Sequence, residues 1–334
     1  MANIFDRKNI LVTGGTGSIG REIVRKVLQY QPNVMRVFNN EEAELFNLEQ
    51  ELENYPNVRF LIGDVRDKGR LQRAVEGIDF VFHAAAFKHV PLCEYNPFEA
   101  VKTNVLGTQN LIEAAMEQEI EKLITISTDK AVNPVNVMGA TKLLAERLTI
   151  SANHYKGARK TVFSCVRFGN VLDSRGSVVP LFREQIKRGG PVTITDPDMT
   201  RFVMSIPQAV DLVLKAAEIA RGGEIFIFKM RTLHIRDLAE VMIEELAPHY
   251  GYAPETIKIE ISGKRAGEKL YEELLTEDEA LNVSETEDMF VVTADKNRAS
   301  KSLSPEEYRS DKDGIFLTGE EIRGMLKDSS PQDL

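Results

Sequence analysis

Residues 9–20 read NILVTGGTGSIG, a short apolar run followed directly by three glycines spaced three residues apart. The run NILV predicts a buried parallel strand, and the apolar periodicity after residue 20 predicts a helix. In such a turn Gly14 permits the tight bend, Gly17 lets the backbone approach a pyrophosphate, and Gly20 allows close helix–strand packing. A helix N-terminus also favours phosphate. A glycine-rich turn without a ligand is the alternative. The predicted dinucleotide contacts here are Gly14, Thr16, Gly17, Ser18 and Ile19.

Strands and helices alternate through the first half of the chain. Apolar runs at 34–38, 58–62, 80–83 and 162–168 predict further strands. This alternation predicts an α/β fold with a Rossmann-type doubly wound parallel sheet, followed by a smaller C-terminal α/β substrate domain. In that second part we expect a helix from residue 200, a loop and then a helix within 262–275, and few strands beyond residue 285.

The end of the second predicted strand bears on cofactor choice. An acidic residue there usually holds the adenosine ribose diol. Asn39 takes that place, and it can bond the diol without repelling a 2′-phosphate. NAD and NADP both stay open, with a slight preference for NADP, and a polar strand end without a selective role is the alternative.

Two further strand ends are candidates for cofactor contact. Asp64 follows the third strand, with Val65 beside it, where an adenine amino group is commonly met; a helix N-cap is an equal rival for this aspartate. The small side chains of Ala84, Ala85 and Ala86 let the backbone pass beside a flat ring or a sugar-phosphate.

Residues 124–142, ITISTDKAVNPVNVMGATK, predict a strand, a polar tip, a turn and a helix. Parallel sheets present reactive groups at such carboxyl ends of strands. A surface ion pair within the tip is the alternative to chemistry. Met138 stands four residues before Lys142, where a tyrosine would make a catalytic pair, and a thioether has no titratable proton. The tip consists of Thr128, Asp129 and Lys130.

Acid–base work by this tip requires shifted pKa values. A lysine base must lose its proton, and burial beside a cation or a ketone can lower its pKa from ~10.4 towards neutral. A carboxyl acting as an acid needs a raised pKa, which burial supplies. Adjacent Asp129 and Lys130 are expected to titrate as a coupled pair. The loop after residue 86 brings Lys88 and His89 to the same edge, where His89 can serve as an acid or base or make one structural hydrogen bond.

Composition excludes several classes of function. The chain has 334 residues, 43% hydrophobic and 28% charged, as in a globular protein, and its net charge of −9 argues against a nucleic-acid partner. Cys93 and Cys165 fit no metal spacing, so we predict no metal site and expect reduced thiols in a cytoplasmic protein. The sequence shows neither a signal peptide nor an apolar run of the ~18–20 residues that cross a membrane, so no direct membrane insertion is expected.

Six motifs that cover most of the chain carry a family resemblance: TGGTGSIG, HAAAFKHVP, STDKAVNPVNVMGATK, FGNVLDSRGSVVPLF, DPDMTRFVMS and KRAGEKLYEELL. Together they resemble the extended short-chain dehydrogenase/reductase family. Within it they are similar to the UDP-N-acetylglucosamine 4,6-dehydratases of capsule, O-antigen and protein-glycan sugar synthesis. The glycine motif alone indicates only a dinucleotide. The combination of STDKA with the motifs FGNVLDSRGSVVPLF and KRAGEKLYEELL is far more specific.

The resemblance implies a lyase that makes a UDP-4-keto-6-deoxy sugar with NAD or NADP. Hydride leaves C4, a base takes the C5 proton, the C6 hydroxyl leaves as water, and hydride returns to C6, with C5 retained or inverted. By position, Asp129 matches the acid at the C6 hydroxyl and Lys130 the base at C5. Thr128 matches the 4-oxygen contact, and Lys142 matches the lysine that holds the nicotinamide ribose.

The resemblance leaves one proton acceptor open. Some similar 4,6-dehydratases have methionine at the position of Met138, which therefore does not imply inactivity. Thr128, relaying through Asp129 or water, is the substitute base that we favour at the 4-oxygen. The alternatives are a UDP-hexose 4-epimerase and a non-catalytic protein that senses a dinucleotide.

The resemblance also implies a division of the chain and a set of ligands. Residues 1–170, with the helix near 205–221, would bind the dinucleotide, and 171–204 and 222–334 would bind the nucleotide sugar. A homo-oligomer, at least a dimer, is expected, because relatives pair the helices beginning near Pro97 and Val135. Arginines suit a diphosphate because their donors form a fork, although each can be a surface charge. The predicted substrate contacts are Lys88, His89, Asn170, Arg175, Arg201, Arg265 and Glu268.

Overall fold

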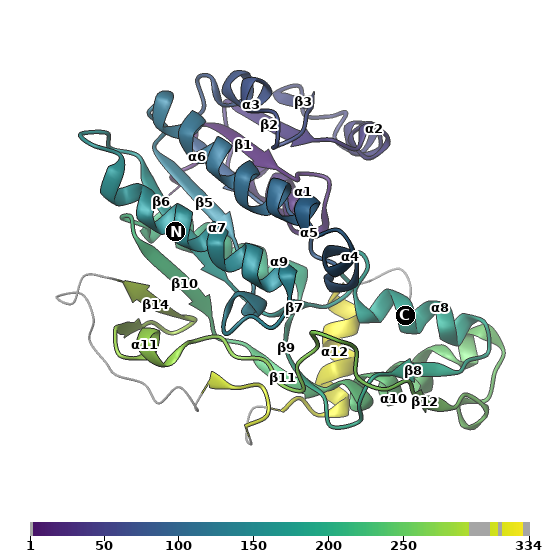
Figure 1. The fold of residues 1–334 in the computed structure, drawn as a ribbon. Coiled ribbons are helices and arrows are strands. Elements are labelled where there is room, and N and C mark those ends of the chain that lie inside the picture. The colour runs from purple at the N-terminus through teal and green to yellow at the C-terminus, as the bar shows by residue number, and fades with distance from the viewer. Residues whose placement is uncertain (1–2, 294–307, 313–315, 330–334) are drawn as a thin grey trace.

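The computed structural model describes residues 3–293, 308–312 and 316–329. Its centre is a nine-stranded sheet with the order β13-β14-β10-β6-β5-β4-β1-β2-β3 (Figure 1). From β10 to β3 the neighbouring strands are parallel, whereas β14 pairs antiparallel with β10 and β13 pairs antiparallel with β14. The order 3-2-1-4-5-6 is that of a Rossmann fold, which confirms the predicted fold class.

The observed elements follow the predicted alternation closely. The strands of the large sheet are β1 (Asn9–Thr13), β2 (Val34–Asn39), β3 (Val58–Ile62), β4 (Phe80–His83), β5 (Lys122–Ile126), β6 (Val162–Arg167), β10 (Glu224–Phe228), β13 (Val283–Glu285) and β14 (Met289–Thr293). The helices of the first part are α1 (Ser18–Leu28), α2 (Glu42–Glu51), α3 (Lys68–Val75), α4 (Val90–Tyr95), α5 (Pro97–Ala100), the π-helical turn η1 (Val101–Leu106), α6 (Gly107–Glu117), the 3-10 turn η2 (Asp129–Ala131) and α7 (Val137–Tyr155).

Helices cover both faces of the large sheet. On one face α1 packs against α9 (Ile206–Ile219), and on the other α3, α6 and α7 lie in a row. Each helix buries an apolar stripe at helical spacing, such as Ile23 and Val27 of α1 against Val213 of α9. The two faces form separate apolar clusters.

A second, smaller core lies beyond the carboxyl ends of the strands. It contains three helices, α8 (Val178–Lys187), α10 (Ile235–Leu246) and α12 (Gly319–Ser329). Of these, α8 and α12 both pack against α10 (Figure 1). Phe182 and Ile186 of α8 and Leu238 and Met242 of α10 share this apolar cluster. Two small sheets complete the region, with the orders β11-β9-β7 and β12-β8. Their strands are β7 (Asn170–Val171), β8 (Val192–Ile194), β9 (Thr200–Met204), β11 (Arg231–His234) and β12 (Ile259–Ile261).

The structure differs from the expected arrangement at three places in the second half of the chain. Residues 200–204 form strand β9 because all five are buried and pair with β7 and β11; the helix begins after the Ser205 cap. The part beyond residue 285 contributes strand β14, which extends the large sheet. Consequently β10 and β14, within the range 222–334 expected to bind the sugar, belong to the dinucleotide-type sheet.

The third difference concerns residues 269–275, which form an extended strap where we expected a helix. Arg201 of β9 donates to two consecutive carbonyl oxygens of the strap, at 2.9 and 3.1 Å. Arg167 of β6 donates to the carbonyl oxygen of Leu274 at 2.9 Å. These bonds satisfy carbonyl groups that a helix would pair internally, and they hold the strap against the end of the sheet.

Arg167 is also the centre of a buried ion cluster. Its guanidinium binds Glu146 of α7 and Glu279 of α11 (Glu277–Ala280), each through two hydrogen bonds of 2.7–3.0 Å. The arginine is almost fully buried, and the opposing charges outweigh the desolvation, so its pKa stays well above the usual value. The cluster therefore fixes the end of the strap to the large sheet.

Candidate active site

A large cavity opens at the carboxyl ends of the parallel strands, next to the smaller core. Its volume of about 1370 Å³ exceeds the ~300–1,000 Å³ of a typical small-molecule site, so it has room for a dinucleotide and a second ligand. Most predicted site residues line it: Gly14, Gly17, Ser18, Ile19, Ala84, Ala86, Lys88, His89, Thr128, Lys130, Met138, Lys142, Asn170, Arg175, Arg201, Arg265 and Glu268. The predicted residues that do not line it are Thr16, Asn39, Asp64, Val65, Ala85 and Asp129.

The glycine turn has the geometry that its spacing predicts. Gly14 has φ +66°, and a Cβ there would lie 2.7 Å from the backbone nitrogen of Ala85. A Cβ on Gly20 would lie 2.2 Å from the carbonyl oxygen of Gly14. Gly17 is different, since a Cβ there would meet only that same oxygen, at 3.3 Å. Gly17 also starts α1 without a side-chain cap, so this helix N-terminus faces the cavity with backbone N–H groups suited to a pyrophosphate.

The second-strand end lies just behind this turn. The Asn39 amide donates to the hydroxyl of Thr16 at 2.7 Å, so it braces the glycine turn from the next strand. Asp64 forms an ion pair with Arg66 at 2.6 Å, and this hydrogen bond lowers the pKa of the carboxyl. The N-cap of α3 is Asp67, so the capping role considered for Asp64 is wrong. Its contact with an adenine stays a prediction.

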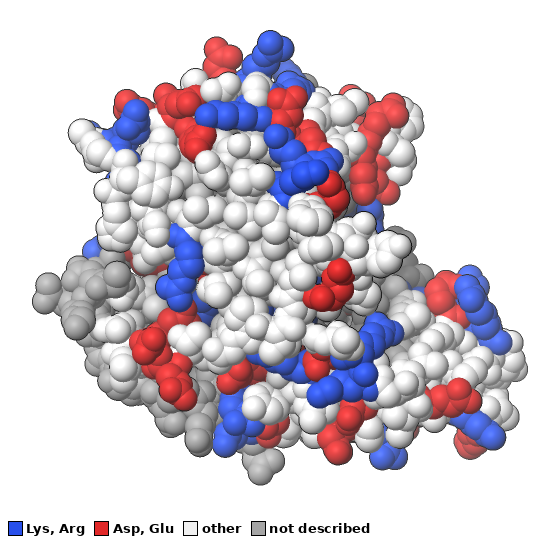
Figure 2. Space-filling view, in the orientation of Figure 1, with Lys and Arg blue, Asp and Glu red and all other residues white. Residues whose placement is uncertain are grey.

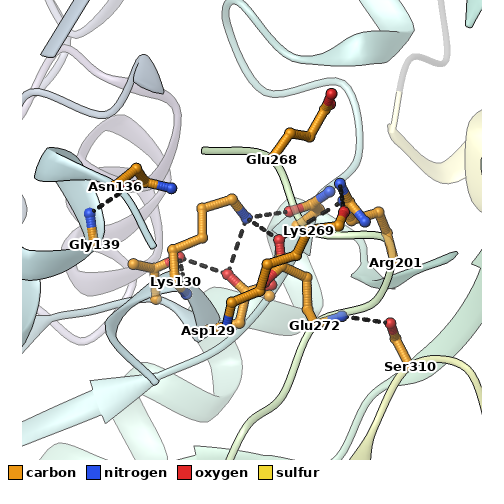
Figure 3. A network of polar contacts seen from close by, with 12 residues as sticks. Asp129, Lys130, Asn136, Gly139, Arg201, Glu268, Lys269, Glu272 and Ser310 are labelled. Atoms are coloured by element: carbon orange, nitrogen blue, oxygen red, sulfur yellow. Dashed lines mark hydrogen bonds and ion pairs between the residues drawn. The ribbon is translucent and has the colours of Figure 1, made fainter. Parts of the chain in front are cut away.

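The polar tip after β5 forms a compact hydrogen-bonded unit (Figure 3). The carboxylate of Asp129 is fully buried, and its Oδ1 accepts from the Thr128 hydroxyl at 2.7 Å and from the Lys130 ammonium at 3.0 Å. The side chain of Asn170 also accepts from Lys130, at 3.1 Å. Thr128 and Lys130 line the cavity, whereas Asp129 supports both of them from behind.

Glu272 on the strap is a site residue that the sequence analysis missed. It lines the cavity, its Oε1 lies 3.6 Å from Lys130 Nζ, and its backbone N–H donates to Ser310 Oγ at 2.8 Å. Burial is the main cause that raises the pKa of its carboxyl, with Asp129 adding to it and Lys130 opposing it. The sequence signal for this segment is weak. Glu272 and Leu274 are both buried, and residues two apart lie on the same face of an extended segment but not of a helix.

The environment of Lys130 corrects one expectation about its pKa. Burial disfavours the ammonium, but the carboxylates of Asp129 and Glu272 outweigh both this effect and the repulsion by Arg201, so the pKa of Lys130 is raised. The expected decrease failed because the second carboxylate was not foreseen. In this structure Lys130 is an ammonium group held between two carboxylates (Figure 3).

The start of α7 places Lys142 and Met138 against the same wall. Asn136 caps the helix, its side-chain oxygen accepting from Gly139 N at 2.8 Å. Lys142 Nζ donates to the carbonyl oxygen of Ile126 at 2.6 Å, and burial lowers its pKa. Met138 is buried, borders the cavity and packs in a small apolar cluster, so it offers the site shape but no proton.

The loop after β4 brings two further basic groups to the cavity. Asn104, in the π-helical turn, holds this loop by accepting from Phe87 N at 2.8 Å and donating to its carbonyl oxygen at 3.0 Å. Burial lowers the pKa of Lys88, helped by repulsion from nearby cations, and burial also lowers the pKa of His89. The lowered pKa therefore lets Lys88 give up its proton more readily than a free lysine, whereas the lowered pKa of His89 favours its neutral imidazole.

The predicted sugar-side residues divide into two places. Glu268 accepts from Arg265 N at 3.0 Å and from Thr195 Oγ1 at 3.3 Å, on the side of the smaller core. Arg175 instead lies over the dinucleotide half, where its backbone N–H donates to Ser18 Oγ and its guanidinium pairs with carboxylates of the β2–α2 segment.

Residues 10–294 match the family model described as polysaccharide biosynthesis protein. The chain belongs to this family. It is 66% identical, over 99% of its length and 98% of the other chain, to an uncharacterized membrane protein of Methanocaldococcus jannaschii. Among the described residues, no helix combines the length and apolar character that crossing a membrane demands.

Two of the relatives have named activities of different kinds. An inverting UDP-N-acetylglucosamine 4,6-dehydratase of Campylobacter jejuni is 44% identical over 87% of this chain and 84% of its own. A UDP-glucose 4-epimerase of Rickettsia canadensis is 38% identical over 97% of this chain and 91% of its own. The solved structure of Pen from Bacillus thuringiensis matches with a TM-score of 0.91 at 48% identity, over 97% of this chain and 98% of that one.

The glycine turn yields a test of the dinucleotide site. Gly17→Ala is expected to weaken NAD and NADP binding about tenfold or more, a loss of about 1.4 kcal/mol, because the methyl group would occupy space that we expect a pyrophosphate to need. Titration calorimetry on dinucleotide-free protein measures both affinities. Folding stability should change little, since the new Cβ has one close contact, at 3.3 Å. Gly20→Ala is the matched comparison and should lower the melting temperature. Unchanged binding by the Gly17 variant would contradict this placement.

Proposed function

We propose that this protein is a UDP-N-acetylglucosamine 4,6-dehydratase that uses NAD or NADP. The observation that carries the proposal is the hydrogen-bonded unit of Thr128, Asp129 and Lys130 at the edge of the cavity, with Lys142 beside it and no tyrosine at 138. The 44% identity to an inverting enzyme of that activity supports it.

The cofactor half of the cavity fits a nicotinamide dinucleotide. When bound, such a group accepts a hydride from sugar C4 and returns it at C6. Gly17 and Ser18 would hold its pyrophosphate, Lys142 its nicotinamide ribose, and the small residues Ala84 and Ala86 its flat or ribose portions. The Asn39 amide donates to Thr16, so its side-chain oxygen could accept from a ribose hydroxyl. The slight preference for NADP rests on residue 39 alone, because Glu41 lines the cavity two residues further on.

Thr128 and Asp129 supply a proton acceptor at the 4-oxygen in place of a tyrosine. As C4 is oxidised, the O4–H bond breaks and its proton passes to Thr128 Oγ, while the Thr128 proton passes to Asp129 Oδ1 across the 2.7 Å hydrogen bond. Asp129 is then a carboxylic acid, and it gives this proton to the C6 hydroxyl, which leaves as water. The aspartate thus begins and ends as a carboxylate.

Lys130 completes the proton cycle. As a neutral amine it takes the C5 proton, which the 4-ketone has acidified, and the electrons of the C5–H bond expel the C6 hydroxyl. Lys130 returns a proton to C5 for retained configuration. For inversion, a proton must reach the opposite face of C5, and we propose Lys88 or His89, which line the cavity, for this role. The lowered pKa of Lys88 makes its ammonium a stronger acid and suits a donor, whereas the lowered pKa of His89 favours a neutral imidazole that would relay a proton.

The UDP half would lie on the side of the smaller core, with contacts from Asn170, Arg201, Arg265 and Glu268. In the present conformation Arg201 is bound to strap carbonyls and Arg175 to carboxylates near the dinucleotide half. Arg175 would reach a diphosphate only after leaving Glu41 and Glu44.

Two other functions compete with this one. The 38% identity to an epimerase over nearly the whole chain favours a UDP-hexose 4-epimerase as the second candidate. A non-catalytic dinucleotide sensor would have no use for the group of Thr128, Asp129 and Lys130 at the edge of the cavity. The site therefore favours chemistry.

A product assay tests the proposed function. The wild-type protein, given UDP-N-acetylglucosamine, should release a sugar nucleotide lighter by one water, whose NMR spectrum shows a C6 methyl group and the C5 configuration. Lys130→Met removes the base and should lower turnover by about 10²–10⁴-fold. Lys264→Met, at an exposed lysine outside the cavity lining, is the control. A UDP-hexose with its 6-hydroxyl intact would instead establish the epimerase.

Thr128→Val tests the proton route to Asp129. The change keeps the shape of the side chain and removes the hydroxyl, so we expect turnover to fall by about 10²–10⁴-fold with little change in KM. Thr128→Ser restores the hydroxyl and should recover most of the activity. If the valine variant turns over at the wild-type rate, another group accepts the O4 proton.

We also propose that the protein forms at least a dimer through α4, α5 and α7. These elements contact one another and expose large apolar side chains, including Tyr95 (87% exposed) and Phe98 (79% exposed). Figure 2 shows the broad uncharged surface around α6 and α7. Such a patch on a monomer is unusual and typical of an interface.

Phe98→Glu places a charge in the middle of this face and should shift the protein towards monomers in sedimentation velocity. Phe46→Glu is the control, because Phe46 is also exposed (58%) but lies on α2, outside the proposed face. A wild-type protein that sediments as a monomer at all concentrations would contradict the proposal.

A further inference from the structure

Glu272 stands in contact with the proposed base from a distant part of the chain. Its carboxyl is buried, borders the cavity and lies 3.6 Å from Lys130 Nζ. Arg201 approaches the same oxygen at 3.8 Å. Among the described residues, the second carboxyl oxygen, Oε2, is buried without a hydrogen-bond partner, and so is Oδ2 of Asp129. In the proposed cycle Asp129 must take the proton that comes from the 4-oxygen, which leaves Glu272 as the acceptor for the proton of Lys130. A buried carboxylate oxygen without a donor is costly, and protonation of that oxygen removes much of the cost.

The total charge of the group shows why a carboxyl that can take up a proton matters for Lys130. Asp129 and Glu272 carry two negative charges, and Lys130 and Arg201 carry two positive charges, so the buried group is neutral. Loss of the lysine proton to solvent would leave it with a net charge of −1. Transfer of the same proton to Glu272 keeps the group neutral. The other charged groups that act on it are Lys269, which faces Glu272, and Lys88, which faces Lys130.

We propose that Glu272 holds the proton that Lys130 must give up before it can act as a base. The proposal rests on the proposed dehydratase function and adds a positioning residue to it. One N–H bond of the ammonium breaks and one O–H bond forms on Glu272, which makes both side chains neutral. Lys130 then takes the C5 proton, and its new positive charge faces the enolate that forms. When the proton returns to C5, Lys130 is neutral again, and Glu272 can return its own proton.

This pairing predicts a distinctive dependence on pH. In this proposal the active and resting forms hold the same number of protons and differ only in whether one proton is on Lys130 or on Glu272. The fraction of protein in the active form therefore does not change with pH, as long as the Lys130–Glu272 pair neither gains nor loses a proton. A lysine that loses its proton to solvent behaves differently, because its neutral fraction rises about tenfold per pH unit below its pKa of ~10.4. With Glu272 as the proton acceptor, the rate of proton removal at C5 should depend little on pH near neutrality. Without it, the rate should rise steeply with pH.

The experiment follows loss of deuterium from C5 of UDP-[5-²H]-N-acetylglucosamine in single turnovers by the dinucleotide-loaded protein, from pH 6.5 to 8.5. The wild-type rate should be nearly flat. Glu272→Gln keeps the size of the side chain but cannot hold the proton, so its rate should rise about tenfold per pH unit. Glu272→Asp should restore a nearly flat profile. Glu273→Gln is the matched control, because this neighbour pairs with Lys269 and does not border the cavity.

Each outcome decides the proposal. A wild-type rate that itself rises tenfold per pH unit overturns it, whatever the variants do. A Glu272→Gln profile parallel to that of the wild type also overturns it, and a lowered melting temperature with weaker UDP binding would then mark a structural role. A wild-type protein that neither exchanges C5 nor forms a 4-keto-6-deoxy sugar refutes the dehydratase function itself, and this result is distinct from a failure of Glu272 alone.

Discussion

Two buried arginines hold the strap that completes the cavity. Arg201 of β9 binds carbonyl oxygens near its start, and Arg167 of β6 binds one near its end. Between these two points the backbone of Glu272 is hydrogen-bonded to Ser310, so the carboxyl has little freedom to move away from the tip of β5. Without these donors, the buried carbonyl groups of the strap would be unsatisfied. The wall of the site therefore depends on guanidinium groups that lie outside the reacting positions.

Sequence reasoning succeeded where local pattern and topology agree. A strand, the glycine turn and a helix follow one another at residues 9–28, and each local feature specifies the same backbone path. The tip from Thr128 to Lys130 was also found, because any residue directly after a parallel strand lies at the carboxyl edge of the sheet. The wider family resemblance added the roles of these residues, which spacing alone does not provide.

The strap shows where that reasoning fails. The sequence KLYEELL is rich in good helix formers, so local propensity favours a helix. The structure overrides this preference because Arg201 and Arg167, both remote in sequence, supply the hydrogen bonds that an extended segment lacks. The same failure explains the incorrect expectation for the pKa of Lys130. Its second carboxylate, Glu272, comes from the strap, and no local pattern links residues so far apart.

In the proposed reaction, Met138 cannot accept a proton, so the proton transfers fall to the remaining polar groups of the site. A tyrosine could accept the O4 proton alone, whereas here Thr128 is joined to Asp129, and Asp129 is joined to Lys130. Lys130 in turn lies beside Glu272. Protons moved along such a chain change the position of charge without changing the total, which is the least costly way to run acid–base chemistry in a buried site. The strap supplies Glu272, the fourth side chain of this row. In the proposed mechanism, the strap therefore helps to compensate for the absence of a tyrosine.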